Sequence, residues 1–520
     1  MATVDLPAPI PPVSPTLITP ASVSDPFVRT QTVARSADWM GDMSVRPRLP
    51  IVIVALMVTM VAVVGVVLWP RGHAETADHV GAVALETMET VPSQVWKRSA
   101  QDLFGPDAAA DNLEVVADGH GVLVVSGRVS TPRPGTALIA VDAESGEPMW
   151  DEPRIGESWN CAIGAGGVLA CADNARVDGL VATRVDFFDL QTGVVSESQT
   201  IRYPGWPSIT AVEDGFVVLV EGTANIGLLS EIDPDAELLA TASFASELPD
   251  QQGRMVGYSS TGTERWAIDP PMNHLRLQQS AGTDMVALED RKGAGFSIYR
   301  ADTRERVHTS SRSGDLYLLY EGGFVIGSGR YTLSSTVAFH DSAGRYQGGL
   351  KGWQLASYRN WPSATVDRKR VPVLLAKRPA FGVVSAGTHA VKWTVPGIAD
   401  DVTLVDENHY LLSTGDVYAA NGGYTKSWTI VDADSGERSR AVSTGFGKTA
   451  VGFDGERLVL AGDGNADHSP NVPHLTAYDM RTGEAVWDSE PVDSKAIWRQ
   501  FGRRLFLLQS AGNAFLAHYK

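Results

Sequence analysis

Residues 475–487 read LTAYDMRTGEAVW, and this stretch contains the pattern that decides the fold. Leu475 and Ala477 are two residues apart, the spacing of side chains on one face of a β-strand. Asp479 then begins a tight turn that ends at a glycine, a residue that tolerates the positive φ such turns require. A second strand carrying Trp487 follows. The stretch therefore predicts a β-hairpin.

The same hairpin recurs along the chain. Clear copies are LIAVDAESGEPMW at 138–150, VDFFDLQTGVV at 185–195 and WTIVDADSGER at 428–438. Weaker copies are found at 256–266, 297–307, 337–346 and 382–393. We predict that the turns of the four clear copies are formed by Asp142 and Gly146, Asp189 and Gly193, Asp432 and Gly436, and Asp479 and Gly483. A spacing of about 40–50 residues is typical of a repeat protein.

Most of these turns are preceded by a second signature, a Gly/Asp turn followed by an apolar run, as in DGHGVLVV at 118–125. Two hairpins per period make a four-stranded antiparallel blade. A single blade exposes both of its apolar faces, so blades must stack around an axis to bury them. The sequence therefore predicts an all-β fold, a β-propeller. We predict that tryptophans pack between its blades, at Trp96, Trp150, Trp266, Trp393 and Trp487.

The number of blades follows from the turns and from the two ends of the repeat region. Eight turns indicate eight units, and the C-terminal tail at 495–519 offers three further strands. The segment Gln94–Ala100 resembles the Trp-bearing outer strand of a blade and could complete the blade formed by the tail, which would remove two sheet edges. Counting the eight units together with the blade formed by the tail gives nine blades. We expect about eight, with one weak unit forming less than a full blade.

The repeat resembles that of quinoprotein-type (PQQ-like) propellers, over roughly residues 94–520. The matching residues are Ala140, Asp142, Gly146 and Trp150; Ala477, Asp479, Thr482, Gly483 and Trp487; Asp189, Thr192 and Gly193; and Asp432, Ser435 and Gly436. That family includes quinone- and calcium-dependent dehydrogenases as well as non-enzymatic scaffolds, such as the lipoprotein propeller of outer-membrane β-barrel assembly. The resemblance implies a β-propeller fold and leaves open whether the chain is a dehydrogenase or a scaffold.

Two cysteines, Cys161 and Cys171, flank a GAGG turn, so they can face each other across a hairpin. In an oxidising compartment this arrangement predicts a structural disulfide, with a metal or redox pair as the alternative. The dehydrogenases of the similar family carry adjacent cysteines over the cofactor ring, and this chain has no Cys-Cys pair. We therefore predict no cofactor, no metal and no catalytic residues, with a degenerate PQQ/calcium-dependent dehydrogenase as the alternative.

The N-terminal region predicts a membrane anchor. Residues 1–48 are rich in Pro, Ser and Thr, which is typical of a disordered tail. Ile51–Trp69 contains nineteen residues without a charge, enough to cross a bilayer core, so we predict a transmembrane helix at 49–70. Arginines are more numerous before this helix than after it, which favours a cytoplasmic N-terminus. A stalk at 71–93 would then precede an extracytoplasmic propeller at 94–520.

The net charge of −18 argues against nucleic acid as a partner, because phosphates select basic surfaces. The sequence favours a non-enzymatic scaffold that binds an envelope protein or a small ligand on a propeller face. A sensor that signals to the N-terminal tail is a further alternative. The long step between Gly193 and Gly262 contains an insertion at 223–252, which we expect to form a distinctive binding loop.

Overall fold

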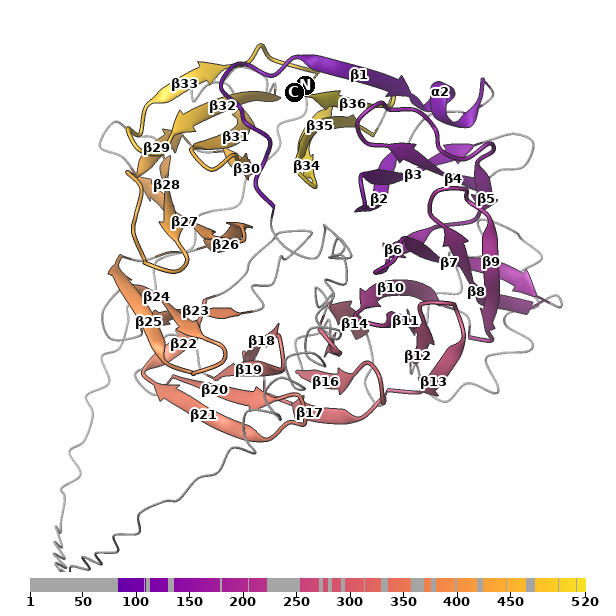
Figure 1. Ribbon diagram of the computed structural model, residues 1–520, viewed down its shortest axis with the longest axis horizontal. Coiled ribbons are helices and arrows are strands. Elements are labelled where there is room, and N and C mark those ends of the chain that lie inside the picture. Colours follow the sequence, from indigo (N-terminus) through magenta and orange to yellow (C-terminus); the bar gives the residue numbers. More distant parts are fainter. Residues whose placement is uncertain are drawn as a thin grey trace, which may run out of the picture. The chain divides into compact units, whose positions relative to one another are not determined.

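The computed structural model describes residues 83–520 except for stretches between its elements, of which 222–252, 357–368 and 464–472 are the longest. The chain divides into two compact units, Met1–Gly72 and His73–Lys520, and every described residue belongs to the second. This unit contains nine four-stranded antiparallel sheets arranged as the blades of a β-propeller (Figure 1).

Eight of the blades are formed by four consecutive strands each. Blade 1 contains β2 (Glu114–Gly119), β3 (Val122–Val129), β4 (Gly135–Asp142) and β5 (Arg154–Gly156); blade 2 contains β6 (Asn160–Ile163), β7 (Val168–Val177), β8 (Leu180–Asp189) and β9 (Val195–Ile201). Blade 3 contains β10 (Trp206–Val212), β11 (Gly215–Glu221), β12 (Arg254–Ser259) and β13 (Glu264–Ile268); blade 4 contains β14 (Leu275–Gln278), β15 (Met285–Asp290), β16 (Phe296–Arg300) and β17 (Arg306–Ser310). Blade 5 contains β18 (Leu316–Tyr320), β19 (Gly323–Ser328), β20 (Thr336–Asp341) and β21 (Tyr346–Lys351); blade 6 contains β22 (Trp353–Leu355), β23 (Arg370–Leu375), β24 (Ala380–Ser385) and β25 (Val391–Pro396). Blade 7 contains β26 (Asp401–Asp406), β27 (His409–Tyr418), β28 (Tyr424–Asp432) and β29 (Val442–Gly445); blade 8 contains β30 (Thr449–Phe453), β31 (Arg457–Asp463), β32 (Pro473–Asp479) and β33 (Ala485–Asp488).

Blade 9 joins the two ends of the repeat region. It contains β34 (Ala496–Phe501), β35 (Arg504–Gln509) and β36 (Phe515–Tyr519) from the C-terminus, and β1 (Gln94–Ser99) from the N-terminus is its outermost strand. β1 pairs antiparallel with β36, so that Trp96 lies opposite His518. This arrangement closes the ring through the N-terminal strand, as the sequence suggested.

The prediction of eight blades is wrong, since the ring has nine. The weak copies at 297–307 and 337–346 lack the tryptophan of the clear copies, yet each belongs to a complete blade of four strands. Their strands are buried in continuous runs, as at residues 296–299 and 318–320, so packing against neighbouring blades does not require the tryptophan. The tail then forms a ninth blade instead of completing an eighth.

The cores of the propeller lie between adjacent blades. The two central strands of a blade carry apolar residues on both faces, whereas the outermost strand buries few side chains: Trp96 is the one buried residue of β1 and Trp487 that of β33. A cluster between blades 8 and 9, for example, contains Val459, Trp487 and Leu505. The short helix α2 (Ala100–Phe104) follows β1 and is capped by the Ser99 hydroxyl, which accepts the N–H of Asp102.

Residues 83–93, the described part of the predicted stalk, pack against blades 8 and 9 (dark purple in Figure 1). We call this segment the strap. Its Leu85 and Met88 side chains are buried, and the N–H of Leu85 donates to the carbonyl of Phe453. At its C-terminal end, Ser93 exchanges backbone hydrogen bonds with Lys520. The strap thus connects the N-terminal chain to the closing blade before β1 begins.

Three other sequence predictions fall on residues that the structure does not describe. These are the tail at 1–48, the transmembrane helix at 49–70 and the insertion at 223–252. Within the described part of residues 83–520, no helix combines the length and apolar character needed to cross a membrane.

Candidate functional site

The repeat turns are built as the Asp/Gly pattern predicted. In blade 1, Asp142 Oδ1 accepts hydrogen bonds from the N–H groups of Glu144 (3.1 Å) and Ser145 (2.8 Å) and from the Ser145 hydroxyl (2.8 Å). The N–H of Gly146 donates to the Asp142 carbonyl at 2.9 Å, and Gly146 has a φ of 71°. The same carboxylate-to-backbone contacts are made by Asp189, Asp432 and Asp479.

These contacts stabilise the charged form of the turn carboxylates. The hydroxyl and N–H of Thr192 lower the pKa of Asp189, and the N–H of Thr482 lowers the pKa of Asp479. In blade 1 partial burial opposes the effect, but the hydrogen bonds from Ser145 prevail and the pKa of Asp142 is also lowered. These ionised carboxylates accept hydrogen bonds within their own turns. They therefore stabilise the fold and are poorly placed to exchange protons with a substrate.

Four of the five predicted tryptophans contact the turn of the following blade. In the interface between blades 1 and 2, the Trp150 indole N–H donates to the Leu190 carbonyl at 2.9 Å. Its ring covers Gly193 so closely that a Cβ added there would lie 2.6 Å from the indole. Equivalent bonds to the next blade are donated by Trp96 to Ala143 (3.3 Å), Trp266 to Ala301 (2.8 Å) and Trp393 to Ala433 (3.1 Å).

The fifth tryptophan uses the strap in place of a turn. Blade 9 has no covalent connection between its third and fourth strands, because β36 ends the chain and β1 begins the ring. The Trp487 indole N–H instead donates to the Met88 carbonyl at 2.8 Å. The N–H of Met88 donates to Asp454 Oδ2 at 2.8 Å, which fixes this carbonyl in position. The strap thereby supplies the acceptor that a repeat turn supplies elsewhere.

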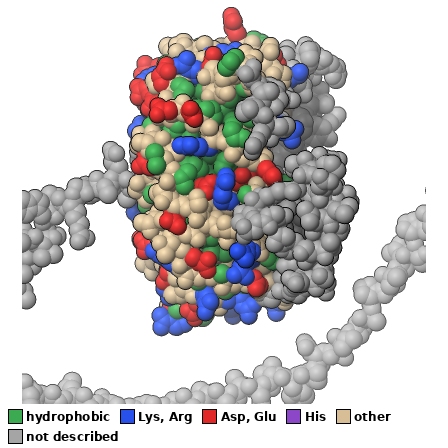
Figure 2. Space-filling view, turned by 90° about the vertical axis from the view of Figure 1, so that its right-hand side faces the viewer, with side chains coloured by type: hydrophobic (Ala, Val, Ile, Leu, Met, Phe, Trp, Pro, Cys, Tyr) green, Lys and Arg blue, Asp and Glu red, His purple; other side chains and the backbone are tan. Residues whose placement is uncertain are grey.

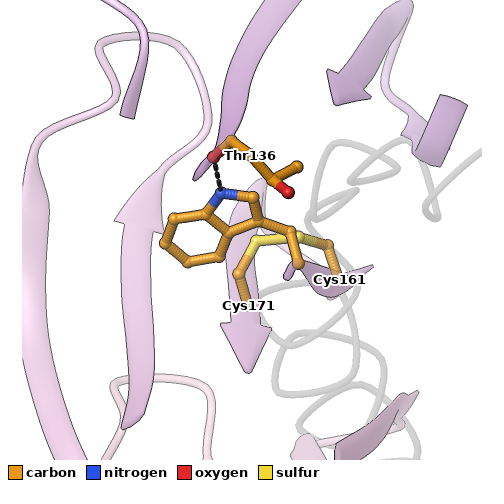
Figure 3. The surroundings of a disulfide bond; sticks show 4 residues. Thr136, Cys161 and Cys171 are labelled. Atoms are coloured by element: carbon orange, nitrogen blue, oxygen red, sulfur yellow. Dashed lines mark hydrogen bonds between the residues drawn. A yellow bond between two sulfur atoms is a disulfide. The ribbon is translucent and has the colours of Figure 1, made fainter. Parts of the chain in front are cut away.

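The disulfide prediction is confirmed. Cys161 on β6 and Cys171 on β7 are direct cross-strand neighbours and are bonded, and both are buried (Figure 3). Trp159 precedes this strand pair, and its indole N–H donates to the Thr136 carbonyl of blade 1 at 2.9 Å (dashed in Figure 3). The disulfide thus ties the innermost strand of blade 2 to its neighbour at the point where blade 1 contacts it.

Two buried carboxyl groups lie on the same strand pair. Asp173, which is 2% exposed, accepts the N–H of Ser158 at 2.8 Å and that of Glu157 at 3.1 Å. Burial raises the pKa of Asp173 to about 6, although these N–H groups and Arg184 act in the opposite direction. Arg184 Nε lies 2.9 Å from Asp186 Oδ2. Burial thus brings the Asp173 carboxyl group into the range where it titrates near neutral pH.

The Asp173 group serves the connection between blades 1 and 2. Its hydrogen-bond donors, Glu157 and Ser158, belong to the short link from β5 to β6, so the carboxyl holds this link against β7. Asp186 accepts the hydroxyl of Ser198 at 2.6 Å. The repeat pattern did not predict a role for Asp173, whose signal in the sequence is a polar residue in the otherwise apolar run VLACAD at 168–173.

A separate group of residues lies where the innermost strands begin. The first strand of a blade lies nearest the centre of the ring (Figure 1), as seen for β2, β6, β10, β18, β26, β30 and β34. Trp206 at the start of β10, Leu316 at the start of β18 and Ile497 near the start of β34 are 47%, 43% and 46% exposed. Because every blade has the same strand order, these starts lie at one end of the axis. We call these three residues the axial mouth.

Tryptophans outside the repeat positions lie in different environments. Trp159 and Trp498 are buried, Trp353 is half-buried and Trp206 belongs to the axial mouth. Among the described residues, no group of three or more His, Cys, Asp or Glu side chains is arranged to hold a metal ion.

Comparisons with known proteins are consistent with the fold alone. No protein-family model matches the chain, and the search of curated proteins found no relative. Among solved structures, BamB from Moraxella catarrhalis is similar with a TM-score of 0.36 and 10% identity, covering 83% of this chain and 98% of that chain. Quinohemoprotein alcohol dehydrogenase from Comamonas testosteroni is similar with a TM-score of 0.37 and 11% identity, covering 82% and 76%. A eukaryotic initiation factor structure gives 0.42 and 10%, covering 79% and 91%.

Proposed function

We propose that this chain is a membrane-anchored, extracytoplasmic scaffold that binds a partner protein at the axial mouth. The observation that supports the proposal is the exposure of Trp206, Leu316 and Ile497 on the innermost strands of three different blades. Exposed large apolar side chains are found at binding surfaces, and tryptophan is enriched among the residues that dominate binding energy.

The position of the strap supports the same proposal. Val83 contacts the Gln500 side chain near the end of β34, and Leu85 contacts Phe453 at the end of β30. The innermost strands end at the opposite face from the one where they begin. The N-terminal chain therefore joins the propeller on the face away from the axial mouth. A partner at the mouth would not compete with the strap for space.

The charges on the side of the molecule support recognition through shape and apolar contact. In Figure 2, acidic and basic side chains are interspersed over this side, with apolar groups between them. Opposite charges at such spacing give no field of a single sign that would steer a strongly charged ligand. The net charge of −18 does not by itself define the partner.

The test is site-specific photo-crosslinking in membranes that contain the full chain. A benzophenone amino acid replaces Trp206, Leu316 or Ile497 in separate variants, and Val486, which is 46% exposed on an outermost strand, serves as the matched control. We expect one partner adduct that is shared by the three mouth positions and missing at Val486. Equal adducts at all four positions, or none at the mouth, would contradict the proposal.

A second assay separates this proposal from the enzymatic alternative. Residues 73–520, the compact unit that contains the propeller, are titrated with pyrroloquinoline quinone and calcium while absorbance and dye-linked alcohol oxidation are followed. We expect neither saturable binding nor turnover. Turnover that survives Trp206→Ala would support a dehydrogenase and would overturn the scaffold proposal.

A further inference from the structure

The interface between blades 4 and 5 is held by histidines where other interfaces use tryptophan. His308 on β17 occupies the position that Trp150 and Trp393 occupy in their blades, four residues after the positive-φ residue of the turn. The positive-φ residue of blade 4 is Arg304. Across the interface, the backbone of Val307 lies against Gly344, so the turn of blade 5 has no indole beneath it.

The rings at this interface form a continuous cluster. His308 lies 5.8 Å from His340 of blade 5, between ring centroids, and 5.7 Å from Phe324. Phe324 stacks on His340 at 4.9 Å with parallel planes, and Phe296 of blade 4 lies 5.8 Å from His308. Both imidazoles are half-buried. The contact between the blades therefore depends on two titratable rings that face each other.

The groups around His308 decide what happens on acidification. The charged or titratable groups that act on it are His340 from blade 5 and Asp315 from the link between the blades. Asp315 is already engaged, since its carboxylate accepts the Ser310 hydroxyl at 2.6 Å. Burial, and next the charge of His340, lower the pKa of His308, whereas Asp315 raises it. The folded protein thus favours the neutral imidazole.

The sign of the pH effect follows. A histidine whose pKa is lower in the folded than in the unfolded protein contributes stability above its unfolded value of about 6.5, and this stability is lost as pH falls. At the interface between blades 1 and 2, the corresponding contact is an indole N–H bonded to a carbonyl, which does not titrate.

We propose that the interface between blades 4 and 5 is an acid-sensitive joint, at which the closed ring loosens when the His308 imidazole becomes protonated beside His340. The joint would let the propeller change the separation of these two blades at mildly acidic pH. Because blade 5 contributes Leu316 to the axial mouth, loosening this joint would also alter the mouth.

The experiment is hydrogen–deuterium exchange of the full chain in detergent at about pH 7.5 and about pH 5.5, corrected for the intrinsic pH dependence of exchange. We expect exchange in β17 and β19 to increase about tenfold more than exchange in β12 and β13, which lie on the blade 3 side of the tryptophan-containing interface between blades 3 and 4. The variant His308→Gln/His340→Gln should lose this difference.

Two results would overturn the proposal. One is an equal increase at both interfaces, which would indicate general destabilisation by acid. The other is a difference that persists in the double variant. If the double variant does not fold, as judged by its thermal midpoint at about pH 7.5, His308→Phe replaces it, because a phenyl ring preserves the apolar packing without a titratable group.

Discussion

The nine blade interfaces fall into two classes. Five contain a tryptophan, whose indole N–H is donated to the next blade in four cases and to the strap in the fifth. At the corresponding position the other four contain Glu197, His308, Gly348 and Arg440. The two classes alternate irregularly around the ring, and both support complete four-stranded blades. The comparison indicates that the apolar central strands determine the fold, whereas the tryptophans determine how firmly each pair of blades is held.

The four interfaces without tryptophan are not equivalent to one another. At the turn glycine Gly262, the nearest atoms of the preceding blade belong to the Phe187 ring and to Cβ of Glu197, where other interfaces have an indole. Beneath Gly483 the nearest atoms are 3.5 Å away, so that turn is loosely covered. Because interface strength varies locally, substitutions at equivalent positions should have very different effects. The following predictions use such pairs, beginning with the largest expected effect.

Removing the strap should destabilise the ring more than any single substitution. A chain beginning at Gln94 loses buried Leu85 and Met88 and leaves the Trp487 indole N–H without its acceptor. The two lost apolar side chains and the unsatisfied donor together should lower the free energy of unfolding by about 5 kcal/mol or more. Urea unfolding measured by tryptophan fluorescence tests this. A chain beginning at Val83 is the control, and equal midpoints would show that the strap contributes nothing.

Trp150→Ala and Arg440→Ala compare the two classes of interface directly. Trp150 is 3% exposed and bonded to Leu190, so its truncation should cost about 4 kcal/mol of unfolding free energy. Arg440 occupies the equivalent position between blades 7 and 8, and its truncation should cost about 0.5 kcal/mol or less. Thermal unfolding followed by circular dichroism measures both. Similar losses would remove the distinction between the classes.

The turn glycines allow a matched test without altering the tryptophans. Gly146 and Gly483 both have positive φ, 71° and 78°, so alanine should cost about 1 kcal/mol at either site. At Gly146 the added Cβ would also lie 2.5 Å from the Trp96 ring, whereas at Gly483 no atom lies within 3.4 Å. We therefore expect Gly146→Ala to cost about 2 kcal/mol more than Gly483→Ala in urea unfolding. A difference below about 0.5 kcal/mol would mean that Trp96 adjusts freely.

Much of this architecture could be predicted from short-range pattern. The turn at Asp142 and Gly146 depends on side chain and backbone within five residues, and the cross-strand partnership of Cys161 and Cys171 follows from one hairpin. Strand alternation is equally local. These features do not require knowledge of which blades are neighbours, so the sequence specifies them directly.

The rest depends on contacts between distant segments. The buried state of Asp173 requires the link from blade 1 to lie against β7, and the acceptor for Trp487 is 399 residues away in sequence. Residues 83–93 contain no strand and no repeat signature, so the sequence predicted a stalk there. The ninth blade was missed for a related reason. The weak repeats without tryptophan did not indicate whether each of them forms a complete four-stranded blade.

Within blade 2, two aspartates should respond to pH in opposite directions. The pKa of Asp189 is lowered by its turn hydrogen bonds, so its contribution to stability is present at neutral pH and lost as pH falls below about 4. The pKa of Asp173 is raised from 3.8 to about 6 by burial. The folded protein therefore holds this proton more tightly, and stability decreases as pH rises from about 4 to about 6.

Asp173→Asn isolates this effect, because an amide oxygen can still accept the N–H groups of Glu157 and Ser158 without a charge. Relative to the unsubstituted protein, the variant should gain about 2 kcal/mol of unfolding free energy between about pH 4 and about pH 7. Thermal midpoints across that range give the difference, and Asp189→Asn is the control that should show no such gain. A constant difference between Asp173→Asn and the unsubstituted protein at every pH would mean that the carboxyl group does not titrate in this window. The interface between blades 1 and 2 would then be insensitive to pH at its link as well as at its tryptophan.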